Sequence, residues 1–350
     1  MTDRLRIGSR GSALALVQSR WVGDRLAELH PGLEVEIDVI QTKGDKLLDA
    51  PLAKLGDKGL FVKEIEEALH DGRVDLAVHS AKDMPTETPG GLEIAAFTAR
   101  EDVRDVFVAH PRAPARRLEE LARGAVVGTS SLRRRSQLLS LRPDLEVVDI
   151  RGNVETRMRK VEEQDMAGTI LAAAGLARLG RAGAAAFAFT FDELLPAVGQ
   201  GSLALEARAG DERVGALLAP LADDAATLAV RAERALMRAL QGGCQVPIAG
   251  YGELVAGGSA GGRRRGSAPA DGPHPADAAS DGARHAGGLA ARELRLRAFV
   301  GALDGREAVR LEAAGPAGAP EALGERLAGE LLAAGADRIL AAVRAEAEGA

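Results

Sequence analysis

The sequence has a single cysteine, Cys244, and few aromatic residues, among them one tryptophan and one tyrosine. One cysteine excludes a disulfide within the chain and fits a reducing compartment. The six histidines show no metal-ligand spacing, so we expect no metal site. No apolar run is long enough to span a membrane. The residues Met1–Arg4 lead directly into a strand pattern instead of a signal peptide. These features predict a soluble, cytoplasmic protein.

Positive charge is not in excess either. The formal net charge is −6, which argues against general affinity for nucleic acid. The sequence contains neither a phosphate loop of the Walker type nor a GxGxxG fingerprint. Lysine is scarce: only seven of the 45 basic residues are lysines, and six of these lie between Lys43 and Lys82. This cluster indicates either a functional segment or a chance patch on the surface.

Strand and helix patterns alternate from Leu5 to about Leu176. Among them, helices are predicted over residues 13–29, 60–69, 132–141 and 154–163. Such alternation predicts parallel or mixed sheets with helices on both faces. A third region, of α+β type, begins with a helix over residues 227–240. The length of the chain and its apolar content are sufficient for two or three domains.

Two segments interrupt this order. Residues 42–59 form a long connection that is rich in lysine and glycine, and a connection of this kind inside a compact domain is often a lid over a site. Residues 257–288 contain no Val, Ile, Leu, Met, Phe, Tyr or Trp. Because such a segment cannot bury enough apolar surface to offset its ordering entropy, we predict a disordered surface insertion.

Cys244 lies in the stretch GGCQVP, directly after the predicted helix. Two glycines stop the helix where a left-handed C-terminal cap forms most easily, and Pro247 with Ile248 indicates entry into a strand. A lone cysteine can be a small buried hydrophobic residue. Its position between glycines and Gln245 instead favours a reactive or modified thiol, and composition alone leaves both open.

Three predicted strand-to-helix turns carry hydroxyl groups and arginines, over residues 9–12, 128–135 and 151–157. Free backbone N–H groups and the helix dipole make such turns suitable for anions, and arginine adds bidentate recognition of carboxylate or phosphate. Any one turn is equally well explained by capping serines and solvated charge. Three of them at the ligand-binding edge of α/β sheets predict an anion site.

Lys82 and Asp83 follow a buried strand in the same way. The aspartate alone could cap a helix or form a turn. Beside Lys82 and close to several arginines, an ionised carboxylate is also suited to stabilising a transient cation.

The chain resembles the porphobilinogen deaminase (hydroxymethylbilane synthase) family, and the resemblance covers nearly all of it apart from residues 257–288. The motifs that carry it occur in the family's order: RIGSRGSALAL, QTKGD, GDKGLFVKE, DLAVHSAKDMP, GTSSLRRR, RGNVETR, LPAVGQG and GGCQVPIAG.

The resemblance implies an activity and a cofactor. In the family, a dipyrromethane made from two substrate units is attached by a thioether to the cysteine that matches Cys244. Four porphobilinogens are added head to tail with loss of ammonia, and hydrolysis releases hydroxymethylbilane. The catalytic residues would be Asp83, which stabilises cationic intermediates, and Lys82.

The resemblance also implies binding residues, because each pyrrole carries an acetate and a propionate. The implied cofactor-binding residues are Cys244, Ser12, Lys82, Asp83, Thr129, Ser130, Arg133 and Arg134. The implied substrate-binding residues are Arg10, Ser80, Arg151, Arg157, Arg178 and Gln200. The implied lid residues are Lys54, Lys58 and Phe61.

The implied fold is α/β, with two doubly wound domains of the periplasmic-binding-protein type, mixed sheets, and a smaller α+β C-terminal domain. The expected domain limits are residues 1–100 with 200–220, residues 101–199, and residues 221–350, the last with the insertion at 257–288. The expected partner is the small molecule porphobilinogen, with no nucleic acid, no membrane and a monomeric chain.

Two other functions fit part of the sequence. A non-catalytic two-domain anion-binding protein would share the fold, but the missing export signal and Cys244 count against it. A regulator that contacts nucleic-acid phosphate through residues 130–135 would need a less acidic chain.

Overall fold

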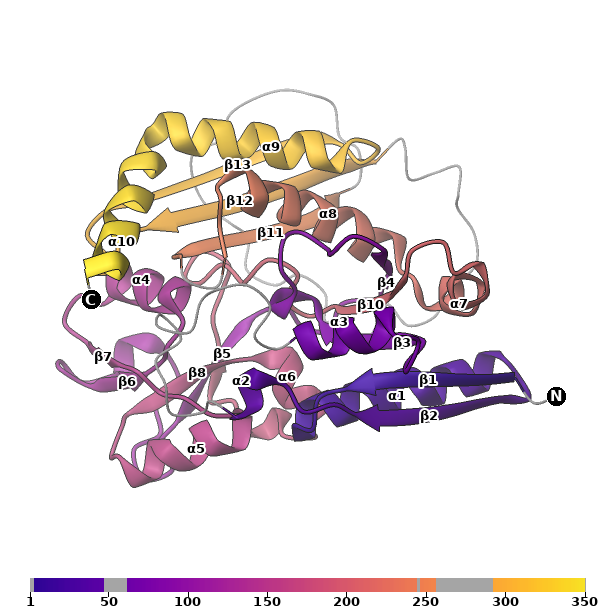
Figure 1. The fold of residues 1–350 in the computed structure, drawn as a ribbon. Helices are drawn as coiled ribbons and strands as arrows, with labels where there is room; N and C mark the ends of the chain where they lie inside the picture. Colours follow the sequence, from indigo (N-terminus) through magenta and orange to yellow (C-terminus); the bar gives the residue numbers. More distant parts are fainter. Residues whose placement is uncertain (1–2, 47–61, 244–245, 256–291, 350) are drawn as a thin grey trace.

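The structure, a computed structural model, describes residues 3–46, 62–243, 246–255 and 292–349. Within these ranges the main strands form two five-stranded sheets and one three-stranded sheet. In Figure 1 the three-stranded sheet, coloured orange to yellow, lies above the other two, which lie side by side below it. The predicted lid residues, Cys244 and the predicted insertion all lie outside the described ranges.

The first sheet has the strand order β2-β1-β3-β10-β4. In that order its strands are Leu33–Val39, Asp3–Ser9, Leu76–Ser80, Leu203–Arg208 and Leu92–Phe97. Strand β1 is parallel to β2 and β3, whereas β10 is antiparallel to both β3 and β4. Since β10 comes from much later in the chain than its neighbours, the chain leaves this sheet after β4 and returns to it. The associated helices are α1 (Ala13–Leu29), α2 (Lys43–Lys46), α3 (Lys63–His70) and α7 (Glu212–Leu218).

The second sheet has the order β7-β6-β8-β5-β9. In that order its strands are Glu146–Val148, Val126–Gly128, Gly168–Ala172, Asp105–Ala109 and Phe187–Ala188. Its helices are α4 (Leu132–Leu141), α5 (Val154–Glu163) and α6 (Ala173–Arg178). Helices α4 and α5 have the predicted bounds, because side chains just before them cap their N-termini: Ser131 Oγ accepts from Arg134 N, and Asn153 Oδ1 accepts from Thr156 N.

The third sheet is antiparallel, with the order β11-β12-β13. Its strands are Ile248–Val255, Glu293–Gly301 and Ala308–Pro316. The helices that belong with it are α8 (Asp224–Ala239), α9 (Pro320–Leu331) and α10 (Asp337–Gly349). One buried apolar cluster, including Leu236, Leu296 and Leu327, joins these helices to the sheet. The two mixed sheets and the smaller third sheet confirm the predicted fold class. No helix in the described ranges is long and apolar enough to cross a membrane.

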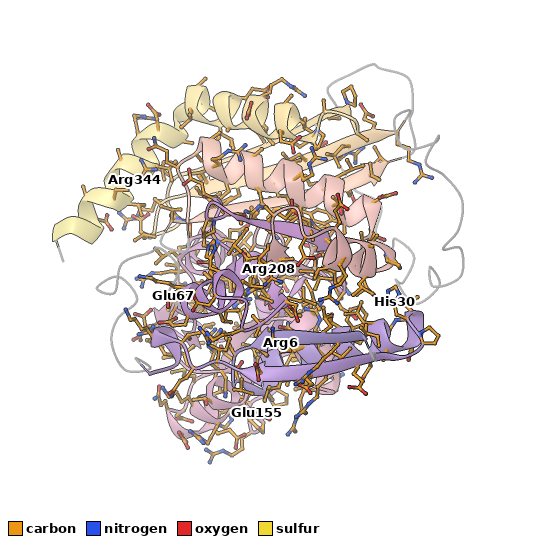
Figure 2. The ribbon with its side chains drawn as sticks, turned by 45° about the vertical axis from the view of Figure 1, so that its right-hand side comes forward. Arg6, His30, Glu67, Glu155, Arg208 and Arg344 are labelled. Atoms are coloured by element: carbon orange, nitrogen blue, oxygen red, sulfur yellow. The ribbon has the colours of Figure 1, made fainter. Side chains whose placement is uncertain are left out.

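Ion pairs to Asp75, directly before β3, join the three middle strands of the first sheet. Arg6 of β1 and Arg208 of β10, both labelled in Figure 2, converge on the buried Asp75. The Arg6 N–H donates to Asp75 Oδ2 at 2.9 Å, and Arg208 Nη2 lies 3.3 Å from Oδ1. This contact ties the returning strand to the strand that starts the chain.

The chain crosses between the first and second sheets twice, after β4 and before β10. Glu233 of α8 holds both crossing segments against the third sheet. It is fully buried, and its carboxylate accepts from Arg100 Nη2, from Gly199 N and from Gly252 N, each at 2.7 Å. Arg100 follows β4, Gly199 precedes β10, and Gly252 belongs to β11. Burial raises the pKa of Glu233, and the charge of Arg100 opposes this. One carboxylate therefore sets the positions of three segments from different parts of the chain.

Helix α8 ends differently from the sequence prediction. The left-handed residue is Gln241, with φ 50°, and not one of the two glycines. Gly242 instead provides space, because a Cβ there would collide with Met237 Sδ, and its N–H donates to Met237 O at 2.8 Å. Arg344 of α10, labelled in Figure 2, donates to Leu240 O at 3.0 Å and so caps this helix end.

Candidate active site

The segment Ala81–Asp83 follows β3 directly and forms a 3-10 turn at the edge of the first sheet. The Ala81 N–H donates to Ser202 O at 3.0 Å. Gly199 packs against this turn: its φ is 74°, and a Cβ there would lie 3.1 Å from the backbone nitrogen of Lys82. Because a left-handed conformation and a close approach coincide here, glycine is the residue that fits. Gly199 thus supports the backbone that carries Lys82 and Asp83.

The Lys82 side chain is half-buried, and Asp83 beside it is exposed. Lys82 Nζ donates to Gln200 Oε1 at 3.4 Å. Loss of hydration lowers the pKa of Lys82 to about 8; the charge of Asp83 opposes this shift, and the charge of Arg134 adds to it. The ammonium group therefore loses its proton in mildly alkaline solution unless an anion binds beside it.

Asp105, the first residue of β5, is fully buried and receives two guanidinium groups from α4. Arg133 Nη1 lies 2.7 Å from Asp105 Oδ2, and Arg134 Nη2 lies 2.7 Å from Oδ1. Gln200 Nε2 donates to the same Oδ1 at 3.0 Å. Burial by itself raises the pKa of Asp105, but Arg133 and Arg134 more than offset this and hold the pKa well below its usual range. Gln200 thereby links Lys82 to the buried ion pairs of the second sheet.

The two arginines have further bonds to the backbone. Arg133 Nη1 donates to Leu195 O at 2.5 Å, and Arg134 Nη1 donates to Ile170 O at 2.8 Å. Two guanidinium groups share the one carboxylate of Asp105, so the cluster keeps a positive charge. Arg134 Nε is buried and has no hydrogen-bond partner among the described residues. This N–H group is available to a ligand oxygen only after local rearrangement, because it is covered.

Arg151 and Arg157 extend this positive cluster from the turn that begins α5. Arg157 Nε donates to Gly152 O at 2.8 Å. Burial lowers the pKa of Arg157 to about 10; the charges of Arg134 and Arg151 add to this shift, whereas that of Asp83 opposes it. Arg151 Nη1 is buried and has no hydrogen-bond partner within the described ranges. These effects on the pKa of Arg157 place Arg134, Arg151 and Asp83 within electrostatic reach of its guanidinium group.

Arg178 approaches the turn at Gly201 from α6. Its Nη2 donates to Gly201 O at 2.6 Å. Burial lowers the pKa of Arg178, and the charge of Glu101 opposes this. Gly201 has φ 93°, and a Cβ there would lie 2.7 Å from Glu101 O, so the chain crossing is tightly packed at this point. Arg178 therefore lies at the same crossing that supports Lys82.

The predicted hydroxyl groups make local bonds that orient the turns. These bonds are Ala15 N to Ser12 Oγ at 3.3 Å, Gln18 Nε2 to Ser80 Oγ at 2.9 Å, Ser131 N to Thr129 Oγ1 at 3.3 Å, and Ser130 Oγ to Ile150 O at 2.9 Å. Ser12 and Arg10 lie at the start of α1, and Gln18 of the same helix links it to Ser80.

The structure thus brings many of the predicted residues into one electrostatically connected cluster: Lys82, Asp83, Gln200, Arg133, Arg134, Arg151 and Arg157. Five of these are cations, set against the carboxylates of Asp83 and Asp105. Buried and half-buried cations that repel one another favour a ligand with several negative charges. Among the described residues, no group of three or more His, Cys, Asp or Glu could hold a metal ion.

Two residues with a positioning role were not among those predicted from the sequence. Asp105 is a charged residue at the start of a buried strand, and Glu233 is a charged residue on the buried face of α8. A buried charge needs a partner, so this placement was a usable signal in both cases. The sequence does not say which arginine supplies the partner, because that depends on the order of strands in the sheet.

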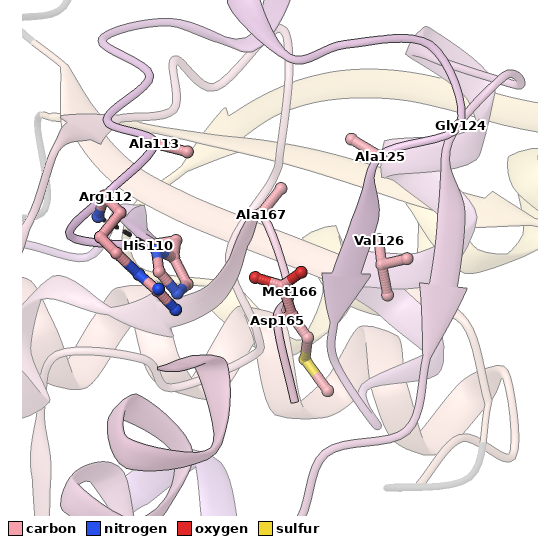
Figure 3. A pocket seen from close by; sticks show the side chains of 9 residues that line it. All are labelled: His110, Arg112, Ala113, Gly124, Ala125, Val126, Asp165, Met166 and Ala167. Carbon is pink, nitrogen blue, oxygen red and sulfur yellow. Dashed lines mark hydrogen bonds between the residues drawn. The ribbon is translucent and has the colours of Figure 1, made fainter. Parts of the chain in front are cut away.

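A cavity of about 490 Å³ lies elsewhere, at the opposite edge of the second sheet (Figure 3). It is lined by residues just after β5, at the start of β6 and just before β8, among them His110, Val126 and Asp165. None of the predicted site residues lines it. The candidate active site is therefore defined by its charged side chains, and the size of this cavity is no guide to it.

Comparison with solved structures gives matches of low similarity. A TRAP periplasmic solute binding protein from Desulfovibrio salexigens is 12% identical, with a TM-score of 0.39 over 63% of this chain and 73% of that chain. The periplasmic aliphatic sulphonate binding protein from Escherichia coli is 17% identical, with a TM-score of 0.38 over 69% of this chain and 71% of that chain. TM-scores this low do not assign a function.

Comparison of sequences is decisive. The family model described as "Porphobilinogen deaminase, dipyromethane cofactor binding domain" matches residues 5–216, and "Porphobilinogen deaminase, C-terminal domain" matches residues 227–259. Relatives named porphobilinogen deaminase include that of Syntrophotalea carbinolica, 48% identical over 98% of this chain and 96% of the relative. The relative from Carboxydothermus hydrogenoformans is 43% identical over 99% of both chains. The chain therefore belongs to the porphobilinogen deaminase family.

Proposed function

We propose that this chain joins four porphobilinogen molecules head to tail and releases linear hydroxymethylbilane, as a deaminating transferase of tetrapyrrole and haem biosynthesis. In each addition a C–N bond of the substrate breaks, ammonia leaves, and a C–C bond forms to the growing chain with loss of a proton. The observation that carries this function is the exposed Asp83 carboxylate at the edge of a cluster of buried and half-buried cations. The function needs both parts: an anion for the reacting cation and cations for the substrate carboxylates.

Asp83 is the proposed catalytic carboxylate. Loss of ammonia leaves a positive charge on the substrate pyrrole, and a fixed negative charge close to that ring stabilises the cation. The turn that carries Asp83 follows strand β3 directly, and Gly199 packs against its first two residues, Ala81 and Lys82. This support limits the movement of the carboxylate, which matters because geometry supplies much of the rate.

The proposed role of the basic residues is to bind carboxylates of the substrate and of the growing chain. Lys82 and Arg157 have pKa values lowered by burial, so a bound carboxylate stabilises their charged forms. Arg10, Arg151 and Arg178 are proposed to act in the same way. The hydroxyl of Ser80 and the amide of Gln200 would assist, and Gln200 also positions Lys82.

The chemistry of the cluster fits a dipyrromethane, whose rings each carry two carboxylates. When bound, the dipyrromethane supplies the free pyrrole carbon at which new units are joined. We propose that it is held covalently by Cys244 through a thioether, and non-covalently by Ser12, Lys82, Asp83, Thr129, Ser130, Arg133 and Arg134. Arg133 and Arg134 retain a net positive charge beside Asp105, and this charge supports their proposed role.

We also propose that the domains follow the three sheets, with residues 1–100 and 200–220 in the first, 101–199 in the second and 221–350 in the third. Lys54, Lys58 and Phe61 are proposed to belong to a lid. A monomeric state and a cytoplasmic location remain proposals that rest on the sequence.

The function is tested by incubating the purified chain with porphobilinogen and measuring both released ammonia and hydroxymethylbilane. We expect four ammonia molecules for each hydroxymethylbilane, because four units are joined. Binding of porphobilinogen without release of ammonia would instead indicate a non-catalytic anion-binding protein.

A further inference from the structure

A second cavity, of about 400 Å³, lies against the segment that follows Asp83, and more arginines than carboxylates line it. It is bounded by Thr86 of that segment, by Phe97 at the end of β4, by α8 and by Glu321 of α9. Three arginines of α8 line it: Arg231, Arg234 and Arg238. Residues three and four apart lie on the same face of a helix, so the three guanidinium groups extend from one side of α8 into one space.

The three arginines differ in how well their charges are balanced. Arg231 Nε lies 2.6 Å from Glu321 Oε1, a close ion pair, and Arg238 Nη2 lies 3.7 Å from Glu325 Oε1, a loose one. Arg234 Nη2 donates to Thr86 O at 3.1 Å, which is a neutral carbonyl. Among the described residues, no carboxylate lies within ion-pair distance of Arg234.

Arg234 is also the most enclosed of the three. It is half-buried, whereas Arg231 and Arg238 are exposed. Burial lowers the pKa of Arg234; the charge of Arg238 adds to this shift, and that of Glu206 opposes it. A half-buried cation with a like charge beside it and only a carbonyl bonded to it is stabilised by an added anion.

The cavity is connected to the reaction centre through shared packing. Ala81 and Met84, which flank Lys82 and Asp83, belong to the same buried apolar cluster as Phe97 and Val230 of α8. Thr86, the residue bonded to Arg234, is three positions after Asp83. A ligand in the cavity would therefore contact both α8 and the segment that carries Asp83.

We propose that this cavity binds a small oxyanion of at least two negative charges, either a polycarboxylate or a pyrophosphate, and that its binding slows the reaction by restraining the segment after Asp83. More than one charge is needed because Glu87 and Glu321 also line the cavity and offset part of the positive charge. This site is separate from the cation cluster around Asp83. Binding of the oxyanion does not depend on the proposed function, whereas the slowing of the reaction rests on the proposed role of Asp83.

The binding test is titration calorimetry of the full chain with citrate and, separately, with inorganic pyrophosphate, at an ionic strength held constant with chloride. We expect one saturable site for at least one of the two, and their comparison identifies the preferred oxyanion. Arg234→Gln should weaken this binding about tenfold or more, since a charge-assisted hydrogen bond is lost. Arg238→Gln, at an exposed position, should weaken it by a smaller factor and serves if Arg234→Gln does not fold.

The matched control is Arg326→Gln on α9, which removes an exposed arginine paired with Glu330 outside the cavity. It should leave binding unchanged. The absence of saturable binding in the parent, or equal binding in the parent, Arg234→Gln and Arg238→Gln, would overturn the proposal. Binding would be equal in all three proteins if the anions were held only by the cations around Asp83.

The kinetic test uses the same anion with porphobilinogen as substrate. We expect kcat to fall severalfold at saturating anion while KM stays the same, and Arg238→Gln to need more anion for the same effect. A purely competitive pattern, or no change in turnover at saturation, would refute the coupling to Asp83.

Discussion

Replacing Asp105 by asparagine tests the organisation of the site. In the parent, its two carboxylate oxygens serve Arg133, Arg134 and Gln200. An asparagine Oδ1 can still accept from Arg134 and Gln200, but the contact of Arg133 with the second oxygen is lost, and so is the negative charge. Breaking a buried ion pair by removing one partner costs about 3–5 kcal/mol. Because one oxygen remains, we expect the lower end, about 3 kcal/mol of unfolding free energy.

The assay is urea unfolding of the parent and Asp105→Asn at pH 7, with Glu163→Gln as the matched control. Glu163 forms an exposed pair with Arg159, so its loss should cost at most about 0.5 kcal/mol. The folded-state pKa of Asp105 is lowered, so its contribution to stability is complete above the unfolded-state pKa of about 3.9 and is lost as the pH falls toward the folded-state pKa. The difference from Asp105→Asn should therefore be constant near neutral pH and shrink below about pH 4. Equal stability of the two variants at pH 7 would refute the reasoning.

Three further predictions concern the reaction. For the parent, kcat/KM should fall as the pH rises through about 8, because Lys82 loses its charge there. Lys82→Arg should move this fall to higher pH, and identical pH profiles of the two proteins would exclude Lys82 as the titrating group. Asp83→Asn should lower turnover by about 10²–10⁴-fold while the free energy of unfolding hardly changes, and the turnover of Asp83→Glu should be slow but measurable. A loss of only a fewfold in Asp83→Asn would reduce Asp83 to a turn former. With Arg157→Ala, mass spectrometry should show enzyme complexes in which chain growth has stalled at an intermediate number of rings. Arg159→Ala, an exposed control on the same helix, should show none. Equal behaviour of the two variants would remove Arg157 from the binding site.

Local features of the fold were predictable from the sequence. Helices α4 and α5 have the predicted bounds because each begins at a side chain that caps it and continues with a helical apolar pattern. These interactions involve residues within one turn of each other, so the sequence contains all the information needed.

Contacts that depend on strand order were not predictable. The bonds of Asp105 with Arg133 and Arg134 depend on the strand order. Strand β5 pairs antiparallel with β8, and β8 in turn lies beside β6, the strand that leads into α4. This brings the start of β5 to the edge where α4 begins. The link from Gln200 to Lys82 needs in addition the return of the chain to the first sheet.

The end of α8 was predicted correctly in kind but not in detail. A left-handed residue was expected at a glycine, and Gln241 takes this conformation. Gly242 is required by the close approach of Met237 and Ile248, which only tertiary packing determines. The predictions for Cys244, for the lid residues Lys54, Lys58 and Phe61, and for residues 257–288 stay predictions, since these residues lie outside the described ranges.

The central claim is that Cys244 carries a dipyrromethane on which the product is built. It is tested most directly by the intact mass of the purified parent and of Cys244→Ser, each measured after incubation with porphobilinogen and removal of free ligand. We predict that the parent carries a mass increment equal to two covalently attached pyrrole units and that Cys244→Ser does not, because a hydroxyl is a much weaker nucleophile than a thiolate. A parent without the increment, or a Cys244→Ser variant that retains it, would contradict the claim.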